Sequence, residues 1–265
     1  MKLSPTGLLT SATRPFTINK IDAPSEISTF VEYFWIVQWD LSEEQSFTSL
    51  NIPFPCAHLV VEAGATGLFG PTKGCFEKKL TGKGFAIGAR FKTGFLYPLI
   101  KVPMTALIDQ RLDTAEIISL STAELESQLV NLNPHTHIIK SLTTLIQHSI
   151  QNVEVPMLEK AKRVYNICRH VEVNQSINQV EQLAQLQTMS VRSLERLFST
   201  YVGLSPKWII RLFRLQQLAN QLIDDAPIDW VGLSLELGYF DQAHCMNDFK
   251  AFTGKSASLI RKGKL

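Results

Sequence analysis

Two arginines at helical spacing are the residues best suited to contact an anionic partner. Arg192 and Arg196 stand four positions apart, and the apolar residues Leu194, Leu197 and Phe198 predict a helix that buries the opposite face. The outer face then carries Arg192, Ser193, Glu195 and Arg196. A guanidinium carries a permanent positive charge and can hold an anion such as a phosphate, so this face is a candidate for binding an anionic partner. The alternative is an ordinary solvated charged face.

A second predicted helix, from Asp241 to about Phe252, offers a related surface. Phe249 and Gly254 repeat the spacing of Phe198 and Gly203, which is a weak internal repeat. The outer positions of this helix carry Gln242, Ala243, His244 and Asn247, and Lys250 and Arg211 are further candidates for phosphate contacts. For His244 a capping or phosphate role is favoured over base recognition, and Lys250 and Arg211 can equally be ordinary surface residues.

Short helices and turns must position these two faces. A short amphipathic helix from Val180 to Leu186 is followed by a break from Gln187 to Met189, and we expect Ser190 to cap the next helix. A long helix should run from Pro206 to about Ile223, and a second short helix from Ile228 to about Leu237. The order helix, break, helix therefore occurs twice, which predicts two helix-turn-helix units. The long helix would hold them about 34 Å apart, as successive major grooves require.

Several short motifs run in order across both predicted units and the long helix between them. They are Leu183-Ala184, Met189 to Phe198, Gly203 to Pro206, Leu237 to His244, Phe249-Lys250 and Gly254. Together they resemble the DNA-binding domain of the AraC/XylS family of transcription regulators, over about Met157 to Lys262. The resemblance implies an all-α domain that binds double-stranded DNA, with Arg192 and Arg196 at base edges or phosphates.

The family's pattern is broken at four positions. Thr188 occupies a turn position that is often glycine, Ser234 one that is usually alanine, and Cys245 one that is usually phenylalanine. Asn247 stands where the family commonly carries arginine on the second recognition helix. Because asparagine is shorter, neutral and better suited to adenine, we expect the second unit to recognise fewer bases than the first.

The preceding part of the chain shows strand patterns and then helical ones. Val31 to Trp39 and His58 to Glu62 are rich in β-branched and aromatic residues, and glycines punctuate residues 64–94. From Leu107 to about Ser149 the apolar residues take helical spacing. The predicted fold is multidomain: an α+β domain over residues 1–155, barrel-like or cupin-like with closing helices, and an all-α domain over residues 156–265.

Four motifs in this first region carry a second likeness. They are Phe34-Trp35, Pro55 to Val60, Phe69 to Pro71 and Gly82 to Phe91. They resemble the β-rich N-terminal domains of a subgroup of AraC-like proteins, which implies binding of a small-molecule effector or pairing with a second copy. Candidate ligand contacts are Trp35, Arg90 and Phe91. Core packing is the alternative for the aromatic residues, and exposure to water is the alternative for Arg90.

Metal and cofactor chemistry finds little support. His58 and Glu62 share one face of a predicted strand, but a metal-binding cupin needs a His-x-His pair in its barrel. The His-x-His pair of this chain, His135 and His137, falls in the helical segment. The cysteines are widely spread without a Cys-x-x-Cys motif, so we expect free thiols, no metal and no cofactor.

Composition narrows the function classes. With 45% hydrophobic and 19% charged residues the chain is typical of a globular protein, and no apolar run approaches the roughly 20 residues of a membrane helix. Without a visible export signal, we expect a cytoplasmic protein and no membrane partner. Residues 160–265 hold 14 basic and 9 acidic residues, a net charge of +5, whereas residues 1–159 carry −3. The basic part is the one suited to phosphate.

These features predict a sequence-specific DNA-binding transcription regulator, responsive to an effector in its N-terminal domain, and not an enzyme. Two alternatives stay open: a DNA-targeted enzyme with catalysis in the N-terminal domain, and an N-terminal domain that only dimerises. RNA polymerase is an expected partner if the protein activates transcription.

Overall fold

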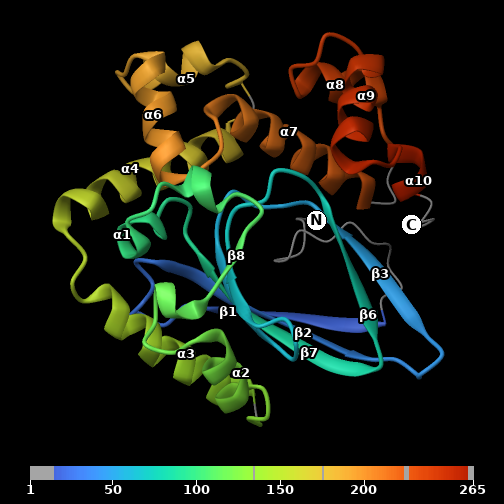
Figure 1. The fold of residues 1–265 in the computed structure, drawn as a ribbon. Coiled ribbons are helices and arrows are strands. Elements are labelled where there is room, and N and C mark those ends of the chain that lie inside the picture. The colour runs from blue at the N-terminus through green and yellow to red at the C-terminus, as the bar shows by residue number, and fades with distance from the viewer. Residues whose placement is uncertain (1–14, 134, 175, 224–226, 262–265) are drawn as a thin grey trace.

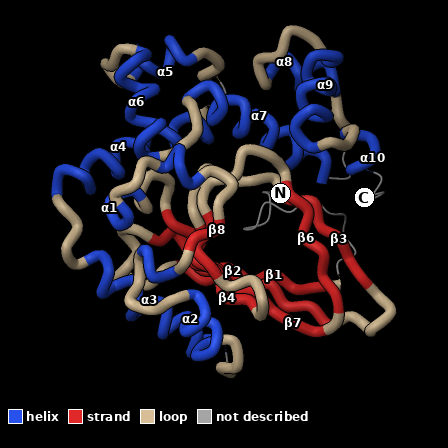
Figure 2. The backbone as a smooth tube through the Cα atoms, viewed as in Figure 1, coloured by secondary structure: helices blue, strands red, loops and turns tan. Residues whose placement is uncertain are grey.

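The computed structural model describes residues 15–133, 135–174, 176–223 and 227–261. Strands occupy the first part of the chain, and helices lie beside them and make up the rest (Figure 1 and Figure 2). Both parts of the predicted fold class are confirmed: a β-rich N-terminal region and a helical C-terminal region. Lys262 and residues 1–14, which our predicted domains include, lie outside the described residues.

The strands form two antiparallel sheets in the part of the chain that the structure describes. They are β1 (Phe16–Asp22), β2 (Val31–Asp40), β3 (Ser46–Asn51), β4 (His58–Glu62), β5 (Gly67–Phe69), β6 (Phe76–Thr81), β7 (Lys83–Phe91) and β8 (Arg111–Leu112). Six are hydrogen-bonded in the order β1-β2-β7-β4-β5-β8, and β3 pairs with β6 in a separate ribbon. β2 and β4 confirm the two strands that we predicted. The barrel-like region thus consists of a sheet and a ribbon facing each other across a cavity.

Side chains alternate between the two faces of the six-stranded sheet, as strand geometry requires. One face is buried in the main hydrophobic cluster and contributes Phe34, Ile36, Leu59, Val61, Ile87, Ala89 and Phe91. Helices α2 (Thr122–Leu129) and α3 (His135–Ile150) place their apolar side chains in the same cluster. The opposite face, which carries Trp35 and Trp39, borders the cavity.

The helical region is a succession of short and long helices. It comprises α4 (Val155–Val173), α5 (Val180–Leu186), α6 (Val191–Tyr201), α7 (Pro206–Ile223), α8 (Trp230–Glu236), α9 (Gln242–Thr253) and α10 (Ala257–Arg261). Three short helical segments precede α2: α1 (Tyr97–Ile100), η1 (Met104–Leu107) and η2 (Thr114–Glu116). The predicted start of the second short helix at Ile228 is wrong by two residues. The helix begins at Trp230 because Asp229 caps it, accepting from the backbone N–H of Gly232 at 3.1 Å.

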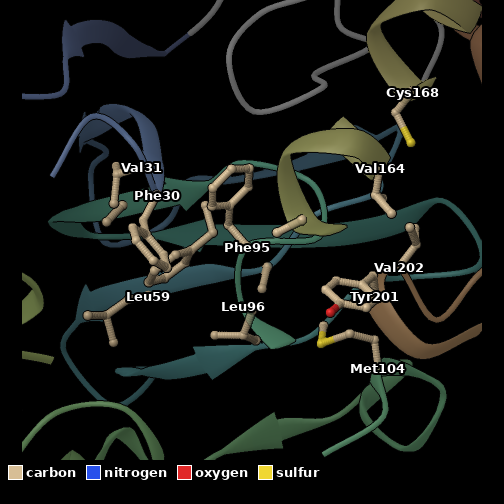
Figure 3. Packing of buried hydrophobic residues seen from close by; sticks show 14 of the residues in the cluster. Phe30, Val31, Leu59, Phe95, Leu96, Met104, Val164, Cys168, Tyr201 and Val202 are labelled. Atoms are coloured by element: carbon tan, nitrogen blue, oxygen red, sulfur yellow. The ribbon is translucent and has the colours of Figure 1, made fainter. Parts of the chain in front are cut away.

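The main hydrophobic cluster runs across both regions. Residues 151–154 separate α3 from α4, near the boundary that we predict between the domains, but packing continues across this break. Figure 3 shows Phe30 and Phe95 of the first region in the same cluster as Val164 of α4 and Tyr201 at the end of α6. The β-rich region therefore supports the first part of the helical region directly.

Candidate nucleic-acid interface

The first helix-turn-helix unit consists of α5 and α6. Ser190 caps α6 as predicted, because its hydroxyl accepts from the backbone N–H of Ser193 at 3.2 Å. The turn between the helices contains Thr188, which has a φ of +52°. Arg163 of α4 donates to the carbonyl of Gln187 at 2.8 Å and so holds the turn on α4.

The outer face of α6 is open to solvent. Leu194 and Phe198 are fully buried on the inner face, whereas Arg192, Glu195 and Arg196 are exposed. Ser193 is half-buried, and its hydroxyl accepts from the Ser190 hydroxyl at 2.9 Å. Neither arginine forms an ion pair with another described residue. Both guanidinium groups are therefore free to meet an anion.

The second unit consists of α8 and α9. Asp241 caps α9, since its carboxylate accepts from the backbone N–H of His244 at 2.7 Å, and Gly254 ends it in the left-handed conformation at a φ of +73°. The predicted contact residues are all exposed: Gln242, Ala243, His244, Asn247 and Lys250. The His244 ring stands edge-on to Tyr239, with centroids 5.2 Å apart.

A polar network fixes the second unit on α7. Arg211 Nε donates to Asp248 Oδ1 at 2.8 Å, and the Tyr239 hydroxyl donates to Asp248 Oδ2 at 2.8 Å. Burial, followed by the Asp248 carboxylate, raises the pKa of Tyr239, so the hydroxyl keeps its proton. Arg211 is committed to this network, which leaves Lys250 as the more accessible of the two additional phosphate candidates.

Two departures from the family pattern lie together in this unit. Ser234 is buried and donates to the carbonyl of Trp230 at 2.7 Å, and its side chain lies within hydrogen-bonding reach of the buried Cys245. Ser234 and Cys245 therefore lie side by side in the buried part of the second unit.

The two units lie at opposite ends of α7 and on the same side of the molecule, away from β1, β2 and β7 (Figure 1). Aligning Leu194 with Cys245 makes Arg196 equivalent to Asn247, and Arg192 equivalent to Ala243. The scaffold is repeated, but the arginine pair is present in one unit only.

One of the three predicted ligand contacts lines the cavity of the β-rich region. Its volume is about 440 Å³, and Trp35 lines it. Phe91 does not, because it lies on the opposite face of the sheet and is buried in the main core. Arg90 does not line it either. Its guanidinium stacks 3.9 Å from the Phe54 ring centroid and pairs with Glu32 at 3.1 Å.

A cysteine and a histidine meet at the edge of this cavity. His58 Nδ1 accepts from Trp35 Nε1 at 3.1 Å, and its Nε2 lies 3.5 Å from Cys56 Sγ. Burial raises the pKa of Cys56 to about 11 and, with the positive Arg90, lowers the pKa of His58 to about 3. Both groups are neutral at pH 7, which is the opposite of the thiolate that nucleophilic catalysis needs.

Several cavity residues were not predicted. Ribbon residues Phe76, Lys78 and Leu80 line it from β6, and the segment 51–54 closes one side. The three β6 residues alternate with Glu77 and Lys79, and this alternation could have predicted that they share one face, since every second residue of a strand points to the same side.

No cluster of three or more His, Cys, Asp or Glu side chains suited to a metal occurs in the described ranges. Within those ranges, every helix is too short or too polar to cross a bilayer.

Two family models match parts of the chain. A helix-turn-helix domain matches residues 183–263, and a domain of unknown function (DUF6597) matches residues 19–113. An uncharacterised HTH-type transcriptional regulator of Haemophilus influenzae is 36% identical over 83 residues. That match covers 31% of this chain and spans only 28% of the relative's own length.

Solved structures of ToxT from Vibrio cholerae show a distant likeness. One, at 1.65 Å resolution, has a TM-score of 0.39 and 9% identity over 94% of this chain and 99% of its own. Another, with a bound unsaturated fatty acid, has a TM-score of 0.36 and 10% identity over 94% of this chain and 95% of its own. TM-scores under 0.5 do not show that two folds are the same.

Proposed function

Because residues 183–263 match a helix-turn-helix domain model and resemble the two units of the AraC type, we propose that this protein is a sequence-specific transcription regulator. It binds double-stranded DNA through the outer faces of α6 and α9. The observation that carries this proposal is the pair of capped, exposed helices at the two ends of one linker helix. Such a pair can enter successive major grooves.

The contacts divide between the two units. Arg192 and Arg196 approach base edges or phosphates, with Ser193 and Glu195 beside them on α6. On α9 the contacts come from Gln242, Ala243, His244, Asn247 and Lys250. Each base contact contributes about 1–3 kcal/mol of discrimination, in addition to a salt-dependent phosphate contribution that every DNA sequence shares.

The remaining properties follow from this role. We expect residues 1–155 to form the domain that receives an effector or pairs with a second copy, and residues 156–265 to form the DNA-binding domain. A regulator of this kind acts in the cytoplasm and, where it activates, contacts RNA polymerase. The neutral Cys56 and His58 pair disfavours the alternative of catalysis in the first domain.

A DNA-binding titration tests the proposal. The full chain is titrated with the region upstream of its own gene and with a shuffled duplex of equal length and base composition, over a range of salt concentrations. We expect preferential binding to the upstream region at physiological salt and weaker binding to both duplexes as salt rises. If the upstream region shows no preference, genome-wide selection of binding sites follows. Equal affinity for all sequences in that selection would contradict the proposal.

A further inference from the structure

The cavity between the six-stranded sheet and the β3–β6 ribbon is large enough to hold a ligand. Its volume of about 440 Å³ falls in the range of pockets that take drug-sized molecules. Among the described residues, the side chains of Phe16, Trp35, Trp39, Phe54, Phe69 and Phe76 line it. A lining of this kind binds through apolar contact and ring stacking more than through hydrogen bonds.

Two tryptophans present flat surfaces on the sheet side. Trp35 and Trp39 pair across β2 and β7 with Gly88 and Gly84. A Cβ on Gly88 would lie 2.1 Å from Trp35 Cζ2, and one on Gly84 would lie 2.6 Å from Trp39 Cζ2. The two indole rings therefore lie directly against the backbone of β7. Trp39 Nε1 also donates to the carbonyl of Thr81 at 3.1 Å, which keeps its ring in place.

The charged groups of the cavity wall balance one another. Two carboxylates, Glu62 and Asp109, and two cations, Lys78 and Arg111, line the cavity, and His58 is neutral. Lys78 Nζ lies 2.5 Å from Glu62 Oε1, and Arg111 Nε donates to the carbonyl of Thr66 at 3.1 Å. Both cations are thus already engaged, Lys78 by a carboxylate and Arg111 by a backbone carbonyl. A charged ligand would lose its hydration here and would have to compete for these groups, whereas a neutral ligand would not.

One side of the cavity also touches the linker helix. Residues 51–54 line the cavity, and Leu50 and Ile52 belong to the same buried cluster as Leu215 of α7. Gln216 of α7, only 5% exposed, donates to the carbonyl of Pro53 at 2.7 Å. A ligand that displaces residues 51–54 must therefore alter the contacts of α7, the helix that spaces the two helix-turn-helix units.

We propose that this cavity binds a neutral, largely apolar molecule with a planar ring system, and that residues 51–54 transmit its binding to α7. The ligand class rests on the cavity alone. The transmission rests on the proposed function, because its consequence is a change in DNA affinity.

Two probes with one skeleton test the ligand class in the full chain. N-phenyl-1-naphthylamine is neutral, and 1-anilinonaphthalene-8-sulfonate adds one negative charge to the same rings. We expect the neutral probe to bind more tightly by about tenfold or more, because the sulfonate would lose its hydration while Lys78 and Arg111 are already bonded to Glu62 and to the Thr66 carbonyl. Equal binding of the two probes, or no binding of the neutral one, would overturn the assignment.

Substitutions of residues that line the cavity test whether the probes bind there. Ala86 lines the cavity between the two tryptophans, so Ala86→Leu should abolish binding of the neutral probe while thermal unfolding reports that the chain remains folded. Glu62→Gln leaves Lys78 unpaired and should raise the affinity of the sulfonate relative to the neutral probe by about tenfold. The control is Glu77→Gln, which removes an exposed carboxylate beside Lys78 and outside the cavity. Unchanged probe preference in Glu62→Gln would contradict the charge argument.

Two neighbouring glutamines test the transmission. Gln216→Leu removes the bond to Pro53, whereas Gln217→Leu removes a bond from α7 to the carbonyl of Glu172 in α4, at 3.3 Å. At a saturating concentration, the neutral probe should change the DNA affinity of wild type and of Gln217→Leu. It should leave the DNA affinity of Gln216→Leu unchanged, although that variant should still bind the probe. A full response in Gln216→Leu, or none in wild type, overturns the transmission. The probe titrations contain no DNA, so they test the cavity even if the proposed function fails.

Discussion

The two helix-turn-helix units share a backbone plan but differ in the chemistry of their exposed faces. Ser190 caps α6 and Asp241 caps α9, and a glycine follows or ends each helix. At equivalent outer positions the first unit carries Arg196 and the second carries Asn247. The comparison teaches that caps and glycines repeat the scaffold, while exposed arginines occur on α6 and not on α9.

The units also differ in their surroundings. Gly203, after α6, lies against η1, and a Cβ there would be 2.5 Å from the carbonyl oxygen of Met104. Its equivalent, Gly254, would have no atom within 4 Å of such a Cβ. The first unit thus packs closely against η1 at Gly203, whereas the space around Gly254 is open.

The largest effect should come from these two glycines. Both have positive φ, so alanine costs about 1–2 kcal/mol at either position. Gly203→Ala also creates a backbone clash, so its total loss of stability should be about 2–5 kcal/mol. Gly254→Ala should lose only the amount due to its positive φ. Chemical denaturation of both variants measures the difference. Equal losses would mean that the contact with η1 does not hold the first unit.

The next largest effect should be a difference between the two units in their contribution to DNA affinity. Arg196→Ala should lose about 1–3 kcal/mol of specific binding and keep much of its non-specific binding, while Asn247→Ala should lose less. The reason is that a guanidinium makes two charge-assisted hydrogen bonds where an amide makes weaker neutral ones. Titration of both variants against the same selected site provides the measurement. A larger loss in Asn247→Ala would reverse the assignment of the dominant unit.

Restoring an arginine should make the second unit more like the first. Asn247→Arg adds a cation on an exposed helix face, so DNA binding at low salt should tighten and the slope of log K against log salt should steepen by about 1. Asn247→Gln lengthens the side chain without adding charge and serves as the control. If both variants have the same salt slope, position 247 does not approach a phosphate.

The smallest effect should come from the turns. Thr188 and Gly238 each follow the cap of the short helix and have φ values of +52° and +74°. A β-branched residue is strained there, so Thr188→Gly should stabilise the chain by about 0.5–1 kcal/mol after the entropy of glycine is counted. Thermal unfolding measures the change. The opposite substitution, Gly238→Ala, introduces a side chain at positive φ and should destabilise the chain. A loss of stability in Thr188→Gly would show that the Thr188 side chain stabilises the folded chain by more than the strain of its positive φ destabilises it.

Much of the helical region was predictable because its signals are local. Ser190, Asp241 and Ser205-Pro206 cap the helices that follow them, and a cap needs only the next three residues. The outer faces of α6 and α9 follow from the same logic, since helical spacing decides which residues share a face. The departure at Thr188 was visible too, and the structure gives its physical meaning as a positive φ.

The cavity was harder to predict because its wall combines strands that are distant in the chain. Alternation marks which residues share a face but not which face is buried under helices. Of the predicted ligand contacts, Trp35 lies at the cavity, whereas Phe91 belongs to the core. Arg90 was a reasonable candidate for an anionic ligand until the fold brought Glu32 and Phe54 to its guanidinium.

The sequence by itself determined the two capped units, their exposed residues and the strands β2 and β4 of the first region, because each depends on neighbours within a few residues. Only the tertiary structure decided how the regions meet. Gln216 and Pro53 are 163 residues apart, and Gly203 contacts Met104 across the boundary that we predict between the domains. Such contacts depend on how whole elements pack, and no local pattern of residue types encodes which distant partner will fill a given space.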